Sequence, residues 1–263
     1  MTTTALGVPE QIPVTVSKPD GPGPFPAVVI MHDCSGLGPR SSGAPGRWQR
    51  ELVARGYVVV IPDGFTTRGL AGGICTAPLA QRRANVGPDR RAGDAYAALA
   101  YTRSLPDVDG RRVGIMGGSH GGTTTLATVL APARGSDSLR REPGAGFAAA
   151  VALYPRCDGA AGDRPLAPLL ILIGENDDWT PAEPCRKLAD AARAAGHAVM
   201  LKVYPGARHS FDSPHRMRYV ATRINPNAPG GRGATTGGDP AAWADSIREV
   251  VAFFDRHLGQ RVH

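Results

Sequence analysis

The sequence predicts an α/β fold, with a mostly parallel central sheet flanked by helices on both faces. Short apolar runs alternate along the chain with segments whose apolar residues recur at helical spacing, which is the pattern of strands joined by crossover helices. The runs at 57–61 and 169–173 are uninterrupted, as is typical of strands buried on both faces. With 263 residues, 42% hydrophobic and 20% charged, the chain suits a single domain over 1–263 with its core at about 12–258.

Turn signals in the first half of the chain separate three expected strands from two expected helices. Gly56 marks the end of one helix, and Pro62 stops the strand that follows it. The strands are expected at 11–17 (an edge strand), 27–31 and 58–61, and the helices at 47–55 and 89–104.

The second half of the chain continues the alternation. Gly196 marks the end of one helix, and Asp239 followed by Pro240 is a good N-cap and first position for the last one. The strands are expected at 112–116, 147–153, 169–173 and 199–204, and the helices at 120–130, at 184–195 and from Pro240 to about 257.

Two long stretches, 63–88 and 206–238, hold few periodic residues. Both are rich in Gly, Pro or Thr, so they predict loops. We expect 206–238 to run over the mouth of the sheet, and both stretches to shape the pocket there.

The run Gly117-Gly118-Ser119-His120-Gly121 directly follows the apolar residues 112–116. It predicts a strand that turns sharply at Ser119 into a helix, as in a nucleophile elbow. Small residues are needed two positions before and after the serine, because the strained turn brings these neighbours together. The helix start would direct N–H groups and its positive dipole end at the serine. As a bare pattern, the run also fits an ordinary Gly-rich turn.

A serine hydroxyl is a poor nucleophile until a histidine takes its proton, and that histidine needs a carboxylate to fix its tautomer. In the α/β-hydrolase arrangement the chain order is Ser, then Asp or Glu, then His, with the last two on loops after later strands. Asp177 follows the strand at 169–173, and His209 follows the strand at 199–204. Ser119, Asp177 and His209 are therefore the predicted catalytic residues.

Other residues compete for these roles. Asp178 cannot be separated from its neighbour by spacing alone, and either carboxylate also suits a turn or helix cap. His215 is close enough to compete as the base, but it lies further from the strand end. His197 precedes its strand and His257 lies on the last helix, so both are poor candidates.

Two backbone N–H groups are needed for an oxyanion hole. One is expected from His120, whose ring is given no role, and the other from Cys34 in the loop 32–38. Cys34 also offers a different chemistry, in which its thiolate is the nucleophile and His209 the base. The His-Asp pair before Cys34 has no second cluster at ligand spacing, so no metal is expected. The serine chemistry needs no cofactor.

The formal net charge of +7 raises the question of a nucleic-acid partner. The arginines are scattered, and their densest group at 82–91 has no interleaved aromatic residues to stack on bases. No apolar run is long enough to span a bilayer. We therefore expect a small-molecule substrate rather than nucleic acid or a membrane, and the sequence leaves the oligomeric state open.

Residues 1–7 lack the charged start and apolar core of a secretory signal, so none is predicted. The compartment stays open between the cytoplasm and, after removal of a signal, the periplasm or exterior. The four cysteines, Cys34, Cys75, Cys157 and Cys185, form no Cys-x-x-Cys motif and no zinc-site spacing. Two disulfides and free buried thiols are both compatible with them.

The motifs together resemble the dienelactone hydrolase family of α/β-hydrolases. The resemblance spans about 12–258 and implies an eight-stranded type of sheet with a missing or short first strand. It also implies hydrolysis of a small ester or lactone through an acyl-enzyme. The matching segments are His32-Asp33-x-x-Gly36, the elbow, Gly174-x-x-Asp177-x-x-x-Pro181, Tyr204-Pro205-Gly206-Ala207-x-His209-Ser210-Phe211 and the helix start Asp239-Pro240-Ala241-Ala242.

Two departures from the family pattern bear on the substrate. The namesake enzymes use a cysteine at the elbow, where this chain has Ser119. They also carry an arginine shortly after the His-Ser-Phe segment that helps to hold a substrate carboxylate, whereas four residues past His209 this chain has Ser213. Both departures favour a carboxylesterase that acts on another ester.

The cysteines resemble those of serine-bearing relatives, which implies disulfides between Cys34 and Cys75 and between Cys157 and Cys185. Two other classes of function stay open beside the esterase. One is a peptidase or acyltransferase with the same triad, because a triad does not define the acceptor. The other is a non-catalytic binding protein on the same fold.

Overall fold

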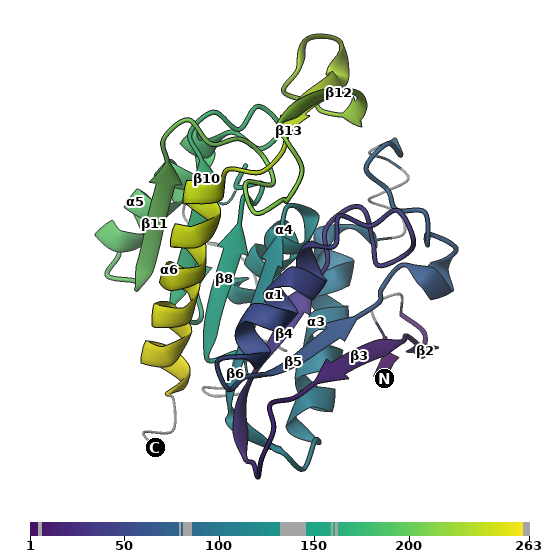
Figure 1. The fold of residues 1–263 in the computed structure, drawn as a ribbon, viewed down its shortest axis with the longest axis vertical. Coiled ribbons are helices and arrows are strands. Elements are labelled where there is room, and N and C mark those ends of the chain that lie inside the picture. The colour runs from purple at the N-terminus through teal and green to yellow at the C-terminus, as the bar shows by residue number, and fades with distance from the viewer. Residues whose placement is uncertain are drawn as a thin grey trace.

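A seven-stranded sheet forms the centre of the computed structural model, which describes residues 1–4, 7–78, 80, 86–131, 146–158, 160 and 163–259 (Figure 1). Neighbouring strands run parallel, except that the last strand of the order below is antiparallel to the one beside it. In spatial order the strands are β11 (Val199–Tyr204), β10 (Leu169–Gly174), β8 (Ala149–Leu153), β6 (Val108–Gly118), β4 (Phe25–Met31), β5 (Val58–Pro62) and β3 (Val14–Ser17).

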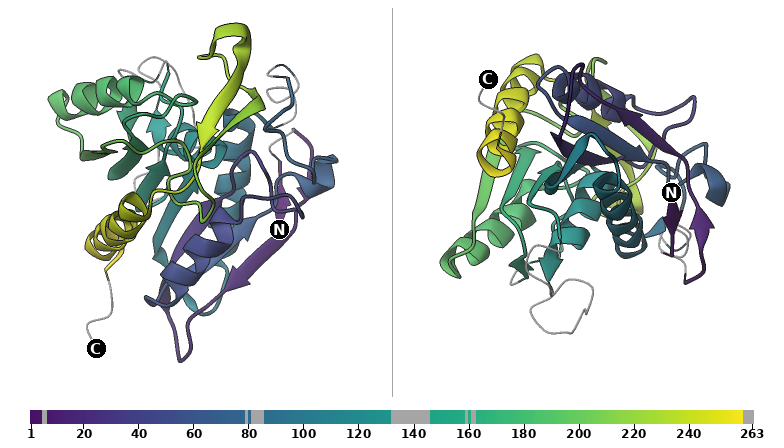
Figure 2. Two further views of the ribbon diagram at one scale, coloured as in Figure 1. Left: turned by 45° about the horizontal axis from the view of Figure 1, so that its top comes forward. Right: turned by 90° about the horizontal axis from the view of Figure 1, so that it is seen from below.

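Helices cover both faces of this sheet (Figure 2). The helix α1 (Ala44–Val53) and the C-terminal helix α6 (Pro240–Leu258) lie on one face. The side chain of Asp239 caps α6 by accepting hydrogen bonds from the N–H groups of Ala241 and Ala242, as its sequence predicts. The opposite face carries α3 (Pro88–Arg103), α4 (His120–Val129) and α5 (Ala182–Ala194).

The covered sheet explains the uninterrupted apolar runs of the sequence. Every residue of β5, β8 and β10 is buried, because helices pack on both faces of these strands. The predicted α/β fold with a mostly parallel sheet is thereby confirmed. Since the parallel strands all point the same way, the loops that follow β4, β6, β10 and β11 emerge at one edge of the sheet.

Most differences from the predicted elements are shifts of a few residues at their ends. The expected edge strand at 11–17 is divided, because only β3 joins the main sheet. Its first part instead forms β2 (Glu10–Gln11), which pairs with β1 (Thr2–Thr3). A further short pair, β7 (Leu130–Ala131) with β9 (Arg164–Pro165), lies outside the main sheet.

The prediction of a plain loop over 206–238 is wrong. This stretch contains an antiparallel hairpin of β12 (Arg218–Ile224) and β13 (Arg232–Thr236), joined through the short 3-10 helix η3 (Pro229–Gly231). The hairpin projects beyond the carboxyl edge of the sheet (Figure 1). Most side chains of β12 are exposed, so no buried face imposes the apolar alternation that marks a strand.

The other predicted loop, 63–88, consists in its described part mainly of turns, with the short 3-10 helix η1 (Thr66–Arg68). Residues 79 and 81–85 of that prediction lie outside the described residues. None of the described helices combines the length and apolar character needed to cross a membrane.

Candidate active site

Ser119 occupies the turn between β6 and α4. Its backbone has φ 54° and ψ −117°, a conformation that residues with side chains rarely adopt. A Cβ at Gly117 would lie 2.5 Å from the carbonyl carbon of Gly121, and one at Gly121 would lie 1.9 Å from the carbonyl oxygen of Met31. The close crossing of strand and helix therefore requires glycine at both flanking positions, as the elbow pattern predicts.

The three predicted catalytic residues form one hydrogen-bonded row. The Nε2 atom of His209 lies 2.8 Å from Oγ of Ser119, and its Nδ1 atom lies 2.8 Å from Oδ2 of Asp177. His209 and Asp177 are only 1% and 4% exposed, whereas Ser119 lines an open pocket. In this geometry the imidazole can accept the serine proton at Nε2 while its Nδ1–H donates to the carboxylate.

The surrounding loop fixes the carboxylate of Asp177 through both of its oxygens. Oδ1 accepts hydrogen bonds from the backbone N–H groups of Trp179 at 2.9 Å and Thr180 at 2.8 Å. Oδ2 faces His209 and also accepts the Thr180 hydroxyl at 2.9 Å. Four donors around one carboxylate hold it in a single orientation.

The alternative carboxylate, Asp178, takes part in other contacts. Its side chain pairs with Arg208 at 3.2 Å and accepts a hydrogen bond from the N–H of Thr235 on β13 at 2.8 Å. Asp178 therefore links the loop of His209 to the hairpin. Spacing could not separate the two carboxylates, but in the structure the Asp177 side chain contacts His209 and the Asp178 side chain contacts Arg208 and Thr235.

The buried carboxyl group of Asp212 was not predicted from the sequence. Asp212 is 1% exposed and accepts hydrogen bonds from Oη of Tyr154 at 2.8 Å and Nε1 of Trp48 at 2.9 Å. Burial raises the pKa of Asp212, and the nearby Arg47 partly opposes that shift. The ring of Tyr154 also packs against His209, with 4.8 Å between centroids. Asp212 thus anchors the histidine loop, and its one sequence signal was a carboxylate three residues after that histidine.

The other histidines occupy different surroundings. The ring of His120 faces Arg91, with 2.9 Å between its Nδ1 and the guanidinium. His215 lines a cavity beside His209. His197 precedes β11 at the opposite edge of the sheet, and His257 lies on α6.

All four cysteines form disulfides, Cys34 with Cys75 and Cys157 with Cys185, as the family resemblance implied. The alternative of a Cys34 thiolate nucleophile is therefore wrong, because its sulfur is bonded to Cys75. Asp33 lies within 4.8 Å of both of these sulfur atoms. As members of a disulfide, the two sulfurs are not thiolates that could ligate a metal.

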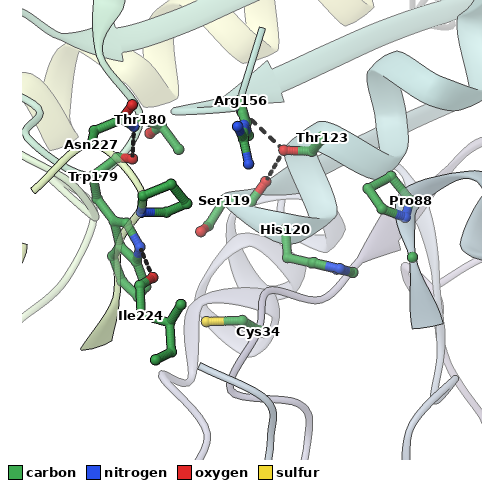
Figure 3. A pocket seen from close by; sticks show the side chains of 12 residues that line it. Cys34, Pro88, Ser119, His120, Thr123, Arg156, Trp179, Thr180, Ile224 and Asn227 are labelled. Atoms are coloured by element: carbon green, nitrogen blue, oxygen red, sulfur yellow. Dashed lines mark hydrogen bonds between the residues drawn. The ribbon is translucent and has the colours of Figure 1, made fainter. Parts of the chain in front are cut away.

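One side of Ser119 opens into a pocket with a largely apolar wall (Figure 3). Trp179 and Ile224 form part of this wall, and the indole Nε1 of Trp179 donates to the carbonyl of Ile224 at 2.9 Å. Cys34 and His120, the predicted oxyanion-hole residues, also line it. The hairpin stretch 206–238 therefore does shape the pocket, as expected.

The other side of Ser119 opens into a cavity rich in guanidinium groups. Two carboxylates also line the cavity, and both accept hydrogen bonds from neutral side chains. Asp33 accepts them from neighbouring serines, and Asp212 accepts them from Tyr154 and Trp48. The Arg223 guanidinium lies 5.5 Å from the centre of the Trp179 ring, and burial lowers its pKa. Because five arginines line the cavity against these two carboxylates, its net charge is positive. Its arginines are Arg40, Arg47, Arg216, Arg218 and Arg223.

The geometry agrees with what sequence comparison finds. The sequence profile of the dienelactone hydrolase family matches residues 12–258. The chain belongs to the dienelactone hydrolase family. Membership places it among the carboxylic ester hydrolases.

Individual relatives are distant. A Methylorubrum extorquens protein, provisionally named a carboxymethylenebutenolidase, is 27% identical over 213 residues, which cover 80% of this chain and 71% of that protein. Among solved structures, a provisionally named dienelactone hydrolase from Klebsiella pneumoniae has a TM-score of 0.69 at 19% identity, covering 97% of this chain and 96% of that one. The apo form of esterase 2 from Thermogutta terrifontis has a TM-score of 0.65 at 20% identity, covering 94% and 90%. At these identities the structures show a shared fold.

Proposed function

We propose that the protein is a serine carboxylesterase that hydrolyses a small carboxylic ester or lactone through an acyl-enzyme. The observation that carries the proposal is the row of hydrogen bonds from Ser119 through His209 to Asp177, with 2.8 Å at each step. Family membership supports the same reaction class.

In this reaction Oγ of Ser119 attacks the ester carbonyl carbon while Nε2 of His209 takes the hydroxyl proton. The backbone N–H groups of Cys34 and His120 bind the oxyanion of the tetrahedral intermediate. The alkoxide leaves with the proton from His209, which gives the acyl-enzyme. A water molecule then attacks the acyl carbon with His209 again as base, and the intermediate releases the acid and restores Ser119. Asp177 keeps Nδ1 protonated and stabilises the imidazolium.

Covalent labelling tests this assignment. A fluorophosphonate probe is expected to label the protein at one equivalent, with the label on Ser119, and to leave Ser119→Ala unlabelled. Thermal melting of Ser119→Ala shows whether it is folded. A folded wild-type protein that does not react with the probe would contradict the proposal and favour a non-catalytic binding protein on this fold.

A panel of substrates separates the esterase from other acyl-transfer enzymes. We expect turnover of short p-nitrophenyl esters, with release of the free acid, and no cleavage of peptide p-nitroanilides. Cleavage of the amides at comparable kcat/KM would indicate a peptidase. Transfer of the acyl group to an added alcohol in preference to water would indicate an acyltransferase.

The cationic cavity predicts a preference among esters. An ester whose acyl part ends in a carboxylate can pair with Arg223, and a hydrogen bond to a charged group is worth about 1.5–3 kcal/mol. We expect Arg223→Gln to lower kcat/KM about 10-fold for mono-p-nitrophenyl succinate and less than about 2-fold for p-nitrophenyl butyrate. The matched control is Arg232→Gln on β13 of the same hairpin, since Arg232 does not line the cavity. Equal losses for both esters would show that Arg223 acts through the fold instead.

A further inference from the structure

Arg91 is a fully buried cation on the first turn of α3. Its Nη1 atom lies 2.7 Å from the carbonyl oxygen of His32 and 2.9 Å from Nδ1 of His120. Within the described part of the chain, no carboxylate forms a salt bridge with Arg91, and its Nε and Nη2 atoms have no hydrogen-bond partner. Burial without a paired carboxylate is costly, so stability alone does not account for a cation at this position.

The two contacts of Arg91 reach the two segments that carry the proposed oxyanion donors. His120 follows Ser119 and contributes one of these N–H groups. His32 directly follows the last residue of β4 and lies two residues before Cys34, which contributes the other N–H group. A single guanidinium nitrogen therefore bridges segments that are far apart in sequence.

His32 adds a second constraint on the Cys34 side. Its ring is fully buried, packs edge-on against Phe65 with 4.4 Å between centroids, and has Nδ1 3.0 Å from the carbonyl oxygen of Asp33. Burial and the charge of Arg91 lower the pKa of His32 well below its usual value, so the ring is neutral and Nδ1–H can donate. The carbonyl and N–H of a trans peptide point in opposite directions. Holding the Asp33 carbonyl toward His32 thus directs the N–H of Cys34 to the other side of the loop.

We propose that Arg91 and His32 are positioning residues that fix the two halves of the oxyanion hole relative to each other. Neither residue touches the substrate. They act by orienting the Asp33–Cys34 peptide and the segment after Ser119. These two segments carry the N–H groups that face the negative charge of the transition state. This inference rests on the proposed serine-esterase function.

The first test is Arg91→Met, which keeps much of the side-chain volume and removes both hydrogen bonds. We expect kcat to fall about 10- to 100-fold while KM changes less than about 2-fold, because a misplaced oxyanion hole weakens transition-state binding specifically. The inhibition constant of a trifluoromethyl ketone analogue of the best ester should rise by a similar factor. The melting temperature should not fall, since a buried unpaired cation has been replaced by an apolar side chain.

A matched control comes from the same helix. Arg103 also donates hydrogen bonds to two backbone carbonyls, those of Gly110 and Gly146. It lies at the end of α3 that is far from Ser119. Arg103→Met is expected to lower the melting temperature and to leave kcat within about 2-fold. If Arg91→Met behaves in the same way, Arg91 is structural and the inference is wrong.

A second pair of variants tests His32 independently, in case Arg91→Met does not fold. The side-chain amide of His32→Asn can reproduce the Nδ1 donor, whereas His32→Leu cannot. We expect His32→Asn to retain kcat within about 3-fold and His32→Leu to lose about 10-fold or more, at similar KM. Equal kcat in the two variants would overturn the role of His32. A wild-type protein without Ser119-dependent ester hydrolysis would instead overturn the proposed function, so the two failures are distinguishable.

Discussion

Asp177→Asn is expected to lower kcat for ester hydrolysis about 10⁴-fold, as the loss of a triad carboxylate does in serine proteases. The hydrogen bonds around Asp177 give the reason. Its Oδ1 accepts two backbone N–H groups, from Trp179 and Thr180, so the oxygen of an asparagine amide must occupy that position. The amide NH₂ then faces Nδ1 of His209, which has to act as acceptor and carry its proton on Nε2. In that tautomer the ring cannot take the proton of Ser119.

Asp178→Asn is the matched control, because it is the same substitution one residue along the chain. Its carboxylate contacts Arg208 and the N–H of Thr235. We expect kcat to stay within about 3-fold of wild type. Initial rates with a p-nitrophenyl ester at pH 7–8 compare kcat of Asp177→Asn and Asp178→Asn. Melting curves show whether both variants are folded. A larger loss in Asp178→Asn would reassign the triad carboxylate.

Removal of the Cys34–Cys75 disulfide is expected to destabilise the protein by about 4 kcal/mol, from the loop-closure entropy of the 41-residue separation. It should also lower kcat, since the bond ties the Cys34 loop to a second segment of the site. The carbonyl of Cys75 in turn accepts the N–H of Ile224 on β12 at 3.3 Å. Denaturant unfolding and ester kinetics of the double variant Cys34→Ala/Cys75→Ala measure the two effects.

The second disulfide supplies the comparison. Cys157 and Cys185 are separated by 28 residues, so removing both by alanine substitution should have a similar cost in stability, about 3.6 kcal/mol. Because neither residue carries an oxyanion donor, kcat should remain within about 3-fold. Equal kcat losses in both double variants would attribute the effect to general destabilisation. Thiol titration of the unreduced, denatured wild type should find no free thiol, and two or more equivalents would contradict the pairing.

The sequence predicted the fold class and the three residues of the proposed triad because both depend on order along the chain. Runs such as 169–173 are apolar throughout because helices cover both faces of their strands, and parallel strands bring their carboxyl ends to one edge. Asp177 and His209 each follow such a strand, and the glycines around Ser119 are required by the turn itself. These features are local, so they can be recognised from spacing.

The tertiary structure decided what depends on side-chain direction and on contacts between distant segments. It distinguished Asp177 from Asp178, which are adjacent in sequence but face different partners. The position of Asp212 three residues after His209 did not reveal that it anchors the histidine loop, because its partner Tyr154 lies 58 residues away in the sequence. The strand at 218–224 of the hairpin has no buried residue, so it lacks the buried face that would reveal it. What the sequence determined by itself was therefore which residues reach the edge of the sheet. The packing of that edge determined which of them meet, because only folding sets the distances between them.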